Sequence, residues 1–138
     1  MAEVRVMRRF EAPPEKVFDA WLDPAKARRF LFATPDGEMV VCDIDARVGG
    51  KFDLTERRPE HGDIKHVGEY VAIERPRLLV FTFAVPQYEP AVTRVRIEIE
   101  PDGAGSRLTL IHTDVLPNWA EQTQQGWGMI LESLARVV

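Results

Sequence analysis

Residues 116–138 read LPNWAEQTQQGWGMILESLARVV, and this final stretch decides how the rest of the chain is arranged. Apolar side chains recur there at steps of three and four residues, at Leu116, Ala120, Trp127, Ile130, Leu131, Leu134 and Val138. Such spacing predicts an amphipathic helix that lays its apolar stripe on a larger apolar surface. Pro117 suits the first turn of this helix, and Asn118 is a candidate capping residue.

Two glycines, Gly126 and Gly128, stand on either side of Trp127 in the middle of this predicted helix. Each glycine costs roughly 0.5–1 kcal/mol of helix stability relative to alanine. A pair of them around one large ring therefore suggests a close approach of another segment or a local pocket. We expect the helix to act as a lid on a curved sheet.

The composition is typical of one soluble globular domain spanning residues 1–138, with 45% hydrophobic and 29% charged residues. A net charge of −4 argues against a nucleic-acid partner, because phosphate contacts need a basic face. No apolar run approaches the roughly 20 residues that a membrane helix needs, and a signal-peptide core is missing. We therefore expect a cytoplasmic protein with no membrane partner.

The rest of the chain predicts an α+β order of elements. Residues 3–10 alternate as a first strand, and prolines at 13, 14 and 24 open two short helices that end near residues 22 and 32. Six strands with turn signals between them follow, at 39–44, 51–56, 64–74, 78–85, 93–100 and 106–113. The economical arrangement is a seven-stranded antiparallel sheet curled around the terminal helix, with the two small helices closing one end.

Several segments resemble START-like (SRPBCC) domains, and in particular the subfamily named after the activator of heat-shock-protein ATPase. They are residues 13–24, 45–52, 68–73, 75–83 and 108–113, together with Gly126-Trp127, Leu131 and Leu134. The resemblance implies a helix-grip (START/Bet v-like) fold with a deep cavity between sheet and terminal helix. Relatives of this kind include lipid and polyketide carriers, aromatase/cyclases, a self-sacrificing resistance protein and a co-chaperone domain, besides stand-alone bacterial members.

The chain departs from the family pattern at two places near the expected mouth of the cavity. Family members often carry a tryptophan pair after the second helix, where this sequence has Phe30-Leu31-Phe32. A glycine commonly follows the His-Thr pair of the last strand, where this sequence has Asp114. A relative's ligand is therefore not transferable to this chain.

His112 is the most interesting polar residue, because alternation turns it inward beside Leu108 and Leu110. It could bind a ligand or shuttle a proton, or it could be a structural histidine that ties the last strand to the helix. Glu69 and Tyr70 are adjacent on a strand, so one of them faces inward, and alternation leaves open which. An inward Glu69 would be a buried carboxylate with a raised pKa.

Metal and nucleophile patterns are weak in this sequence, and we predict neither a metal site, nor a cofactor, nor a catalytic residue. Asp43, Asp45 and Asp53 match no calcium-loop spacing. His61, Asp63 and His66 have metal-capable side chains but fall on a predicted hairpin tip. The single cysteine, Cys42, excludes an intrachain disulfide and is expected to be a small buried side chain, and Ser106 and Ser133 do not assemble into a catalytic triad.

Three functions compete. The first is binding of a small, largely hydrophobic molecule, with a predicted lining of Trp21, Phe52, Glu69, Tyr70, Phe81, Phe83, His112, Trp127 and Leu131. The second is a co-chaperone-like module for a protein partner, which needs an exposed patch to which Tyr88 and Pro90 could contribute. The third is a cyclase- or hydrolase-type enzyme that uses His112 and Glu69. Exposed sheet edges would also allow a homodimer.

Overall fold

The computed structural model describes the backbone of residues 1–138 and all their side chains except those of residues 89 and 90. Along the chain the elements are β1 (Ala2–Phe10), α1 (Pro14–Leu22), α2 (Pro24–Phe30), β2 (Glu38–Ile44), β3 (Lys51–Arg58), β4 (Gly62–Glu74), β5 (Leu78–Val85), β6 (Glu89–Asp102), β7 (Gly105–Val115), the 3-10 turn η1 (Pro117–Trp119) and α3 (Ala120–Val137). The predicted order of strand, two short helices, six strands and long helix is confirmed.

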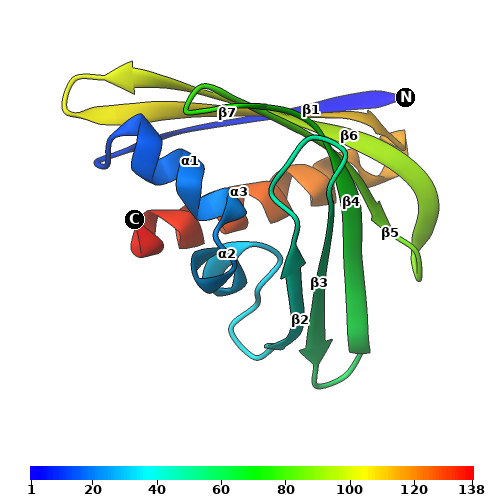
Figure 1. The fold of residues 1–138 in the computed structure, drawn as a ribbon. Helices are drawn as coiled ribbons and strands as arrows, with labels where there is room; N and C mark the ends of the chain where they lie inside the picture. The colour runs from blue at the N-terminus through cyan, green and yellow to red at the C-terminus, as the bar shows by residue number, and fades with distance from the viewer.

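One antiparallel sheet of seven strands spans the described chain in the order β1-β7-β6-β5-β4-β3-β2. From β2 to β7, each strand pairs with the next strand in the sequence. β1 pairs with β7, so β1 and β2 form the two edges of the sheet. The sheet bends strongly, and α3 runs along its hollow side while α1 and α2 lie at one end (Figure 1). This arrangement is the helix-grip fold.

Strand alternation explains which face of the sheet the helix covers. In β6, Val95, Ile97 and Ile99 are buried, whereas Arg94 and Arg96 on the opposite face are exposed. The register places Ile97 opposite Leu110 of β7, so the apolar rows of adjacent strands form one continuous surface. The apolar stripe of α3 covers that surface with the buried side chains Trp127, Leu131 and Leu134.

The start of α3 differs from the prediction. A 3-10 turn precedes the helix, Trp119 occupies the N-cap, and no side chain caps it, so Asn118 is not the capping residue. Close approach does not explain the two helix glycines either, because a Cβ built on Gly126 or Gly128 would meet nothing within 4 Å.

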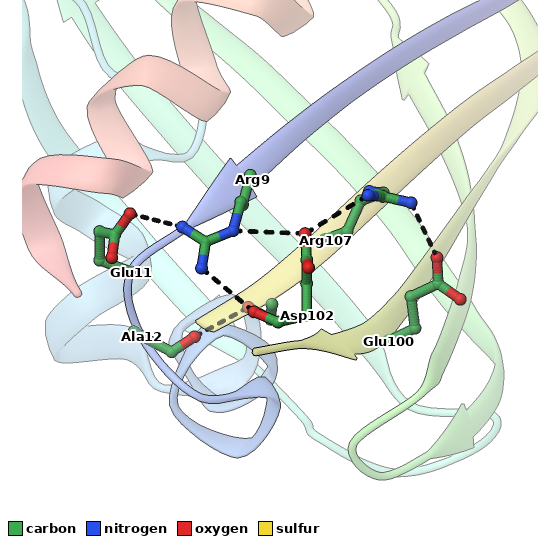
Figure 2. Close-up of polar contacts among 7 residues, drawn as sticks. Arg9, Glu11, Ala12, Glu100, Asp102 and Arg107 are labelled. Carbon is green, nitrogen blue, oxygen red and sulfur yellow. Dashed lines mark hydrogen bonds and ion pairs between the residues drawn. The ribbon is translucent and has the colours of Figure 1, made fainter. Parts of the chain in front are cut away.

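Polar contacts fasten the end of β1 to the β6–β7 hairpin (Figure 2). Arg9 pairs with Asp102 at 3.3 Å and also donates to its carbonyl oxygen at 3.1 Å, while Arg107 reaches the same carboxylate at 3.4 Å. Beneath them, the fully buried Ser106 donates from Oγ to the carbonyl oxygen of Ala12 at 2.9 Å. Ser106 therefore has a structural role, which is to hold the chain as it leaves the sheet for α1.

Candidate functional site

Aromatic side chains fill the end of the interior beneath α1 and α2. Trp21 meets Phe30 edge to face with ring centres 5.2 Å apart, and it packs against Trp127 at 6.4 Å. Phe32 follows, with its ring 5.7 Å from that of Trp127. This half of the space between sheet and helix is therefore packed core.

The opposite end, beneath η1 and the first turn of α3, holds a pocket of about 360 Å³. Its walls come from β3 to β7, the β5–β6 turn, η1 and α3. The residues are Arg58, Ile64, His66, Phe83, Ala84, Val85, Tyr88, Ala91, Thr93, His112, Asp114, Val115, Leu116, Trp119 and Thr123. Apolar atoms provide most of the pocket surface, and six of the lining side chains are polar: Arg58, His66, Thr93, His112, Asp114 and Thr123.

His112 lies on the inner wall of this pocket, held by a chain of hydrogen bonds. Trp127 Nε1 donates to His112 Nδ1 at 3.0 Å, so the neutral ring carries its proton on Nε2. That nitrogen donates to Thr93 Oγ1 at 2.6 Å, and Thr93 in turn donates to the carbonyl oxygen of Phe83 at 3.1 Å. Burial lowers the pKa of His112 to about 4, although the charge of Asp114 acts in the opposite direction. The ring is therefore neutral, and its hydrogen bond with Trp127 ties β7 to the middle of α3.

His66 forms a second polar point of the wall. Its Nδ1 donates to the carbonyl oxygen of Leu54 at 3.0 Å, and its ring stacks on Phe32 with centres 4.4 Å apart. Burial lowers the pKa of His66 to about 4, although the hydrogen bond to the carbonyl oxygen of Leu54 acts in the opposite direction. His66 is thus a buried wall residue within β4, so its predicted place on the hairpin tip is wrong.

Arg58 is the cationic side chain of the lining, and its charge is already matched. Its Nε donates to Glu56, which is 1% exposed and lies beside it on β3. The second carboxylate oxygen of Glu56 accepts from Thr34 Oγ1 at 2.9 Å, which fastens the loop after α2 to the sheet. A buried carboxylate needs such partners, so Arg58 and Glu56 stabilise each other.

Asp114 occupies the position where the family pattern has glycine. Its φ is 65°, in the left-handed region that glycine adopts freely and that aspartate and asparagine tolerate better than most residues. The backbone at this point, one residue before the end of β7, therefore explains the usual glycine. In this chain the position adds a carboxylate to the pocket lining.

Of the predicted lining residues, the structure brings Phe83 and His112 to the pocket. Trp127 does not line the pocket, but it donates a hydrogen bond to His112, which does. Five other predicted residues are buried in the core and do not line the pocket: Trp21, Phe52, Tyr70, Phe81 and Leu131. Glu69 is exposed while Tyr70 is 4% exposed, so the open choice between them is settled with Tyr70 inward. Glu69 and Phe52 instead border a second hollow of about 410 Å³ between β2, β3 and β4.

The remaining chemical candidates stay apart. Within the part of the chain whose side chains are described, no three His, Cys, Asp or Glu residues gather as metal ligands. Cys42 is half-buried, contacts the carbonyl oxygen of Pro24 at 3.5 Å and has a pKa raised by burial. None of the described helices is long and apolar enough to cross a membrane.

The model of the Activator of Hsp90 ATPase homolog 1-like protein family matches residues 11–138. The chain belongs to this family. Among curated proteins none matches the chain. The family resemblance seen in the sequence is thereby confirmed, together with the helix-grip fold.

Solved structures of similar proteins share this fold. A protein from Chromobacterium violaceum has a TM-score of 0.87 at 25% identity, covering 100% of this chain and 98% of its own. One from Nitrosomonas europaea has a TM-score of 0.82 at 22% identity, with coverage of 98% and 92%. An AHSA1-like protein from Aeromonas hydrophila has a TM-score of 0.83 at 22% identity, with coverage of 99% and 92%. Such a family member is a ligand-binding or interaction domain in general terms.

Proposed function

We propose that this family member binds a small, largely hydrophobic molecule in the pocket between the sheet and the start of α3. The observation that carries the proposal is the pocket itself. Its volume of about 360 Å³ lies in the range of ligand sites, and its walls are mostly apolar. Phe83, Val115 and Leu116 would bury the apolar body of the ligand, and that burial would supply most of the affinity.

Catalysis has less support than binding. Both ring nitrogens of His112 are engaged, by Trp127 and by Thr93, so neither is free to exchange a proton with a substrate. Glu69 is exposed and does not line the same pocket as His112. The pairing of these two residues, on which the enzyme hypothesis depended, is therefore missing.

Exposed side chains at the pocket favour a protein partner as the second candidate. Tyr88 is 59% and Trp119 45% exposed, and both line the pocket, while Val92 nearby on β6 is 63% exposed. Such rings could receive an apolar side chain of another protein. The predicted contribution of Pro90 lies outside the described side chains. This candidate needs the same pocket, so a small-molecule titration is the more direct first test.

The test is a fluorescence titration with the neutral apolar dye N-phenyl-1-naphthylamine. The wild-type protein should bind the dye saturably, with one site per chain. Thr123→Phe adds a ring at the pocket wall and should weaken binding about tenfold or more. Gln124→Phe is the matched control, because Gln124 is exposed on the same helix and is not part of the lining.

Absence of saturable dye binding, or equal binding by the two phenylalanine variants, would overturn the proposal. Thermal unfolding of both variants checks that each is folded. Solvent extraction of freshly purified protein followed by mass spectrometry then searches for a retained natural ligand. An apolar compound that is retained by the wild-type protein and lost from Thr123→Phe would identify the ligand directly.

A further inference from the structure

The pocket carries a carboxylate whose charge is unmatched. Asp114 lines it and is exposed, and its side chain makes no ion pair or hydrogen bond with any side chain that the structure describes. Arg58, the cation of the lining, is compensated by the buried Glu56. The two histidines of the lining are neutral, as derived above. Arg58, Glu56 and Asp114 together therefore give the pocket and its immediate surroundings a negative net formal charge.

Two exposed aromatic rings belong to the same lining. Trp119 belongs to η1, a few residues after Asp114, and Tyr88 belongs to the β5–β6 turn. Both rings are about half exposed, at 45% and 59%, so they are accessible from solvent. Aromatic faces attract cations, and the Asp114 carboxylate in the same lining attracts them by its charge. This combination is suited to a positively charged amine.

Resting on the ligand-binding function proposed above, we propose that the ligand is a cationic amphiphile. Its amine or ammonium group would lie beside Asp114 and the rings of Tyr88 and Trp119, and its apolar body would lie along Phe83 and Val115. The net charge of −4 of the whole chain acts in the same direction, because it attracts cations and repels anions.

An anionic amphiphile, such as a fatty acid, fits these charges less well. Its carboxylate would meet Asp114, and Arg58 could receive it only in competition with Glu56. Glu56 is 1% exposed and would then keep its charge without its cationic partner. The cation is therefore the occupant that the lining favours.

The experiment compares three decyl compounds that differ in head group: decyltrimethylammonium, 1-decanol and decanoate. Each displaces the neutral dye from the wild-type protein at concentrations below micelle formation. We expect the ammonium compound to bind about fivefold tighter than the alcohol, and decanoate to bind weakest. The preference for the cation should shrink in 0.5 M salt, because Asp114 is exposed and its charge is screened.

Asp114→Asn and Asp114→Gly remove the charge, and both residues accept the left-handed backbone at this position, so the fold is retained. Each should reduce the preference for the ammonium compound to about half or less, the remainder coming from the rings of Tyr88 and Trp119, and should change the affinity for decanol less than the affinity for the ammonium compound. Asp36→Asn is the matched control, since Asp36 is exposed, carries the same charge and is not part of the lining. Trp119→Leu should reduce the preference in part.

The outcomes separate this inference from the function on which it rests. Equal affinity for all three compounds, or a cation preference that is undiminished in both Asp114 variants, would overturn the cationic ligand and leave apolar binding intact. A preference for decanoate would overturn it in favour of an anion at Arg58. Failure of the dye itself to bind would instead reject the proposed function.

Discussion

At the scale of single residues, the hydrogen bonds of His112 connect the sheet to the helix. A buried N–H without an acceptor costs about 1–3 kcal/mol, and Trp127 Nε1 has its acceptor in His112. His112→Leu removes that acceptor, whereas His112→Gln offers an amide oxygen to Trp127 and an amide N–H to Thr93. We expect the leucine variant to lose about 2 kcal/mol more of the free energy of unfolding than the glutamine variant, measured in urea.

Trp127→Phe provides the control for this prediction, because it removes the donor. In the Trp127→Phe background the difference between leucine and glutamine at position 112 should fall to about half or less. A difference that stays unchanged in that background would show that the hydrogen bond contributes little and that His112 acts through packing alone.

The sequence identified some residues of the site and missed others for a physical reason. Alternation in β7 was regular, so His112 was predicted to face inward, as it does. His66 was missed, although it lies four residues before Tyr70 on the same strand face. If Tyr70 faces inward then His66 does too. The alternation of β4 could therefore have identified His66, but only once it was known that Tyr70, and not Glu69, faces inward.

At the scale of elements, β4 shows why that choice was ambiguous. Its pairing with β5 shifts between Tyr70 and Ala72, which marks an irregularity in the strand. Before the shift Tyr70 faces the core, and after it Ile73 pairs with the buried Leu79 and packs against the core. Apolar residues therefore occur in both phases of the alternation. A strict alternation of inward and outward side chains therefore does not describe the whole of β4.

The two glycines of α3 give the prediction at this scale. A Cβ at Gly126 or Gly128 meets nothing within 4 Å, so alanine there adds helix propensity without a clash. Gly126→Ala and Gly128→Ala should each raise the free energy of unfolding by about 0.5–1 kcal/mol, measured by urea denaturation.

Gly68→Ala is the contrasting control, because its Cβ would lie 1.9 Å from the carbonyl oxygen of Thr82 and 2.4 Å from the Phe52 ring. That substitution should destabilise the protein by about 1–3 kcal/mol. If the two alanines in α3 were as destabilising as this one, the helix glycines would be required by packing after all.

At the scale of the whole molecule, the sequence was sufficient for the fold and insufficient for the position of the pocket. The fold follows from alternation and turn signals that are local in sequence. The position of the pocket depends on which part of the inner face is filled by aromatic rings from segments that are distant in sequence. Examples are the packing of Phe32 against His66 and of Trp21 against Trp127. Sequence reasoning expected core and pocket in different places, but it listed the core aromatics as the pocket walls.

Acid sensitivity is the prediction for the molecule as a whole. Burial lowers the pKa of both His66 and His112 from 6.5 to about 4, and unfolding returns each ring to water, where its pKa is 6.5 again. Between these values the unfolded chain binds more protons than the folded one, so stability is full above pH 6.5 and falls as the pH falls towards 4. Each histidine accounts for about 3 kcal/mol across this window.

Urea denaturation at steps between pH 7.5 and 4.5 measures this loss. Because the pKa of Asp19 is held below 3.8 by the hydrogen bond from Arg75, its contribution is lost only at lower pH and does not obscure the window. His112→Gln cannot titrate and should lose about half of the slope. A free energy of unfolding that stayed constant between pH 6.5 and 4.5 would mean that both rings take up protons in the folded state as readily as in water. That result would contradict the fixed hydrogen bond from Trp127 to His112 Nδ1, because a protonated Nδ1 has no lone pair with which to accept it.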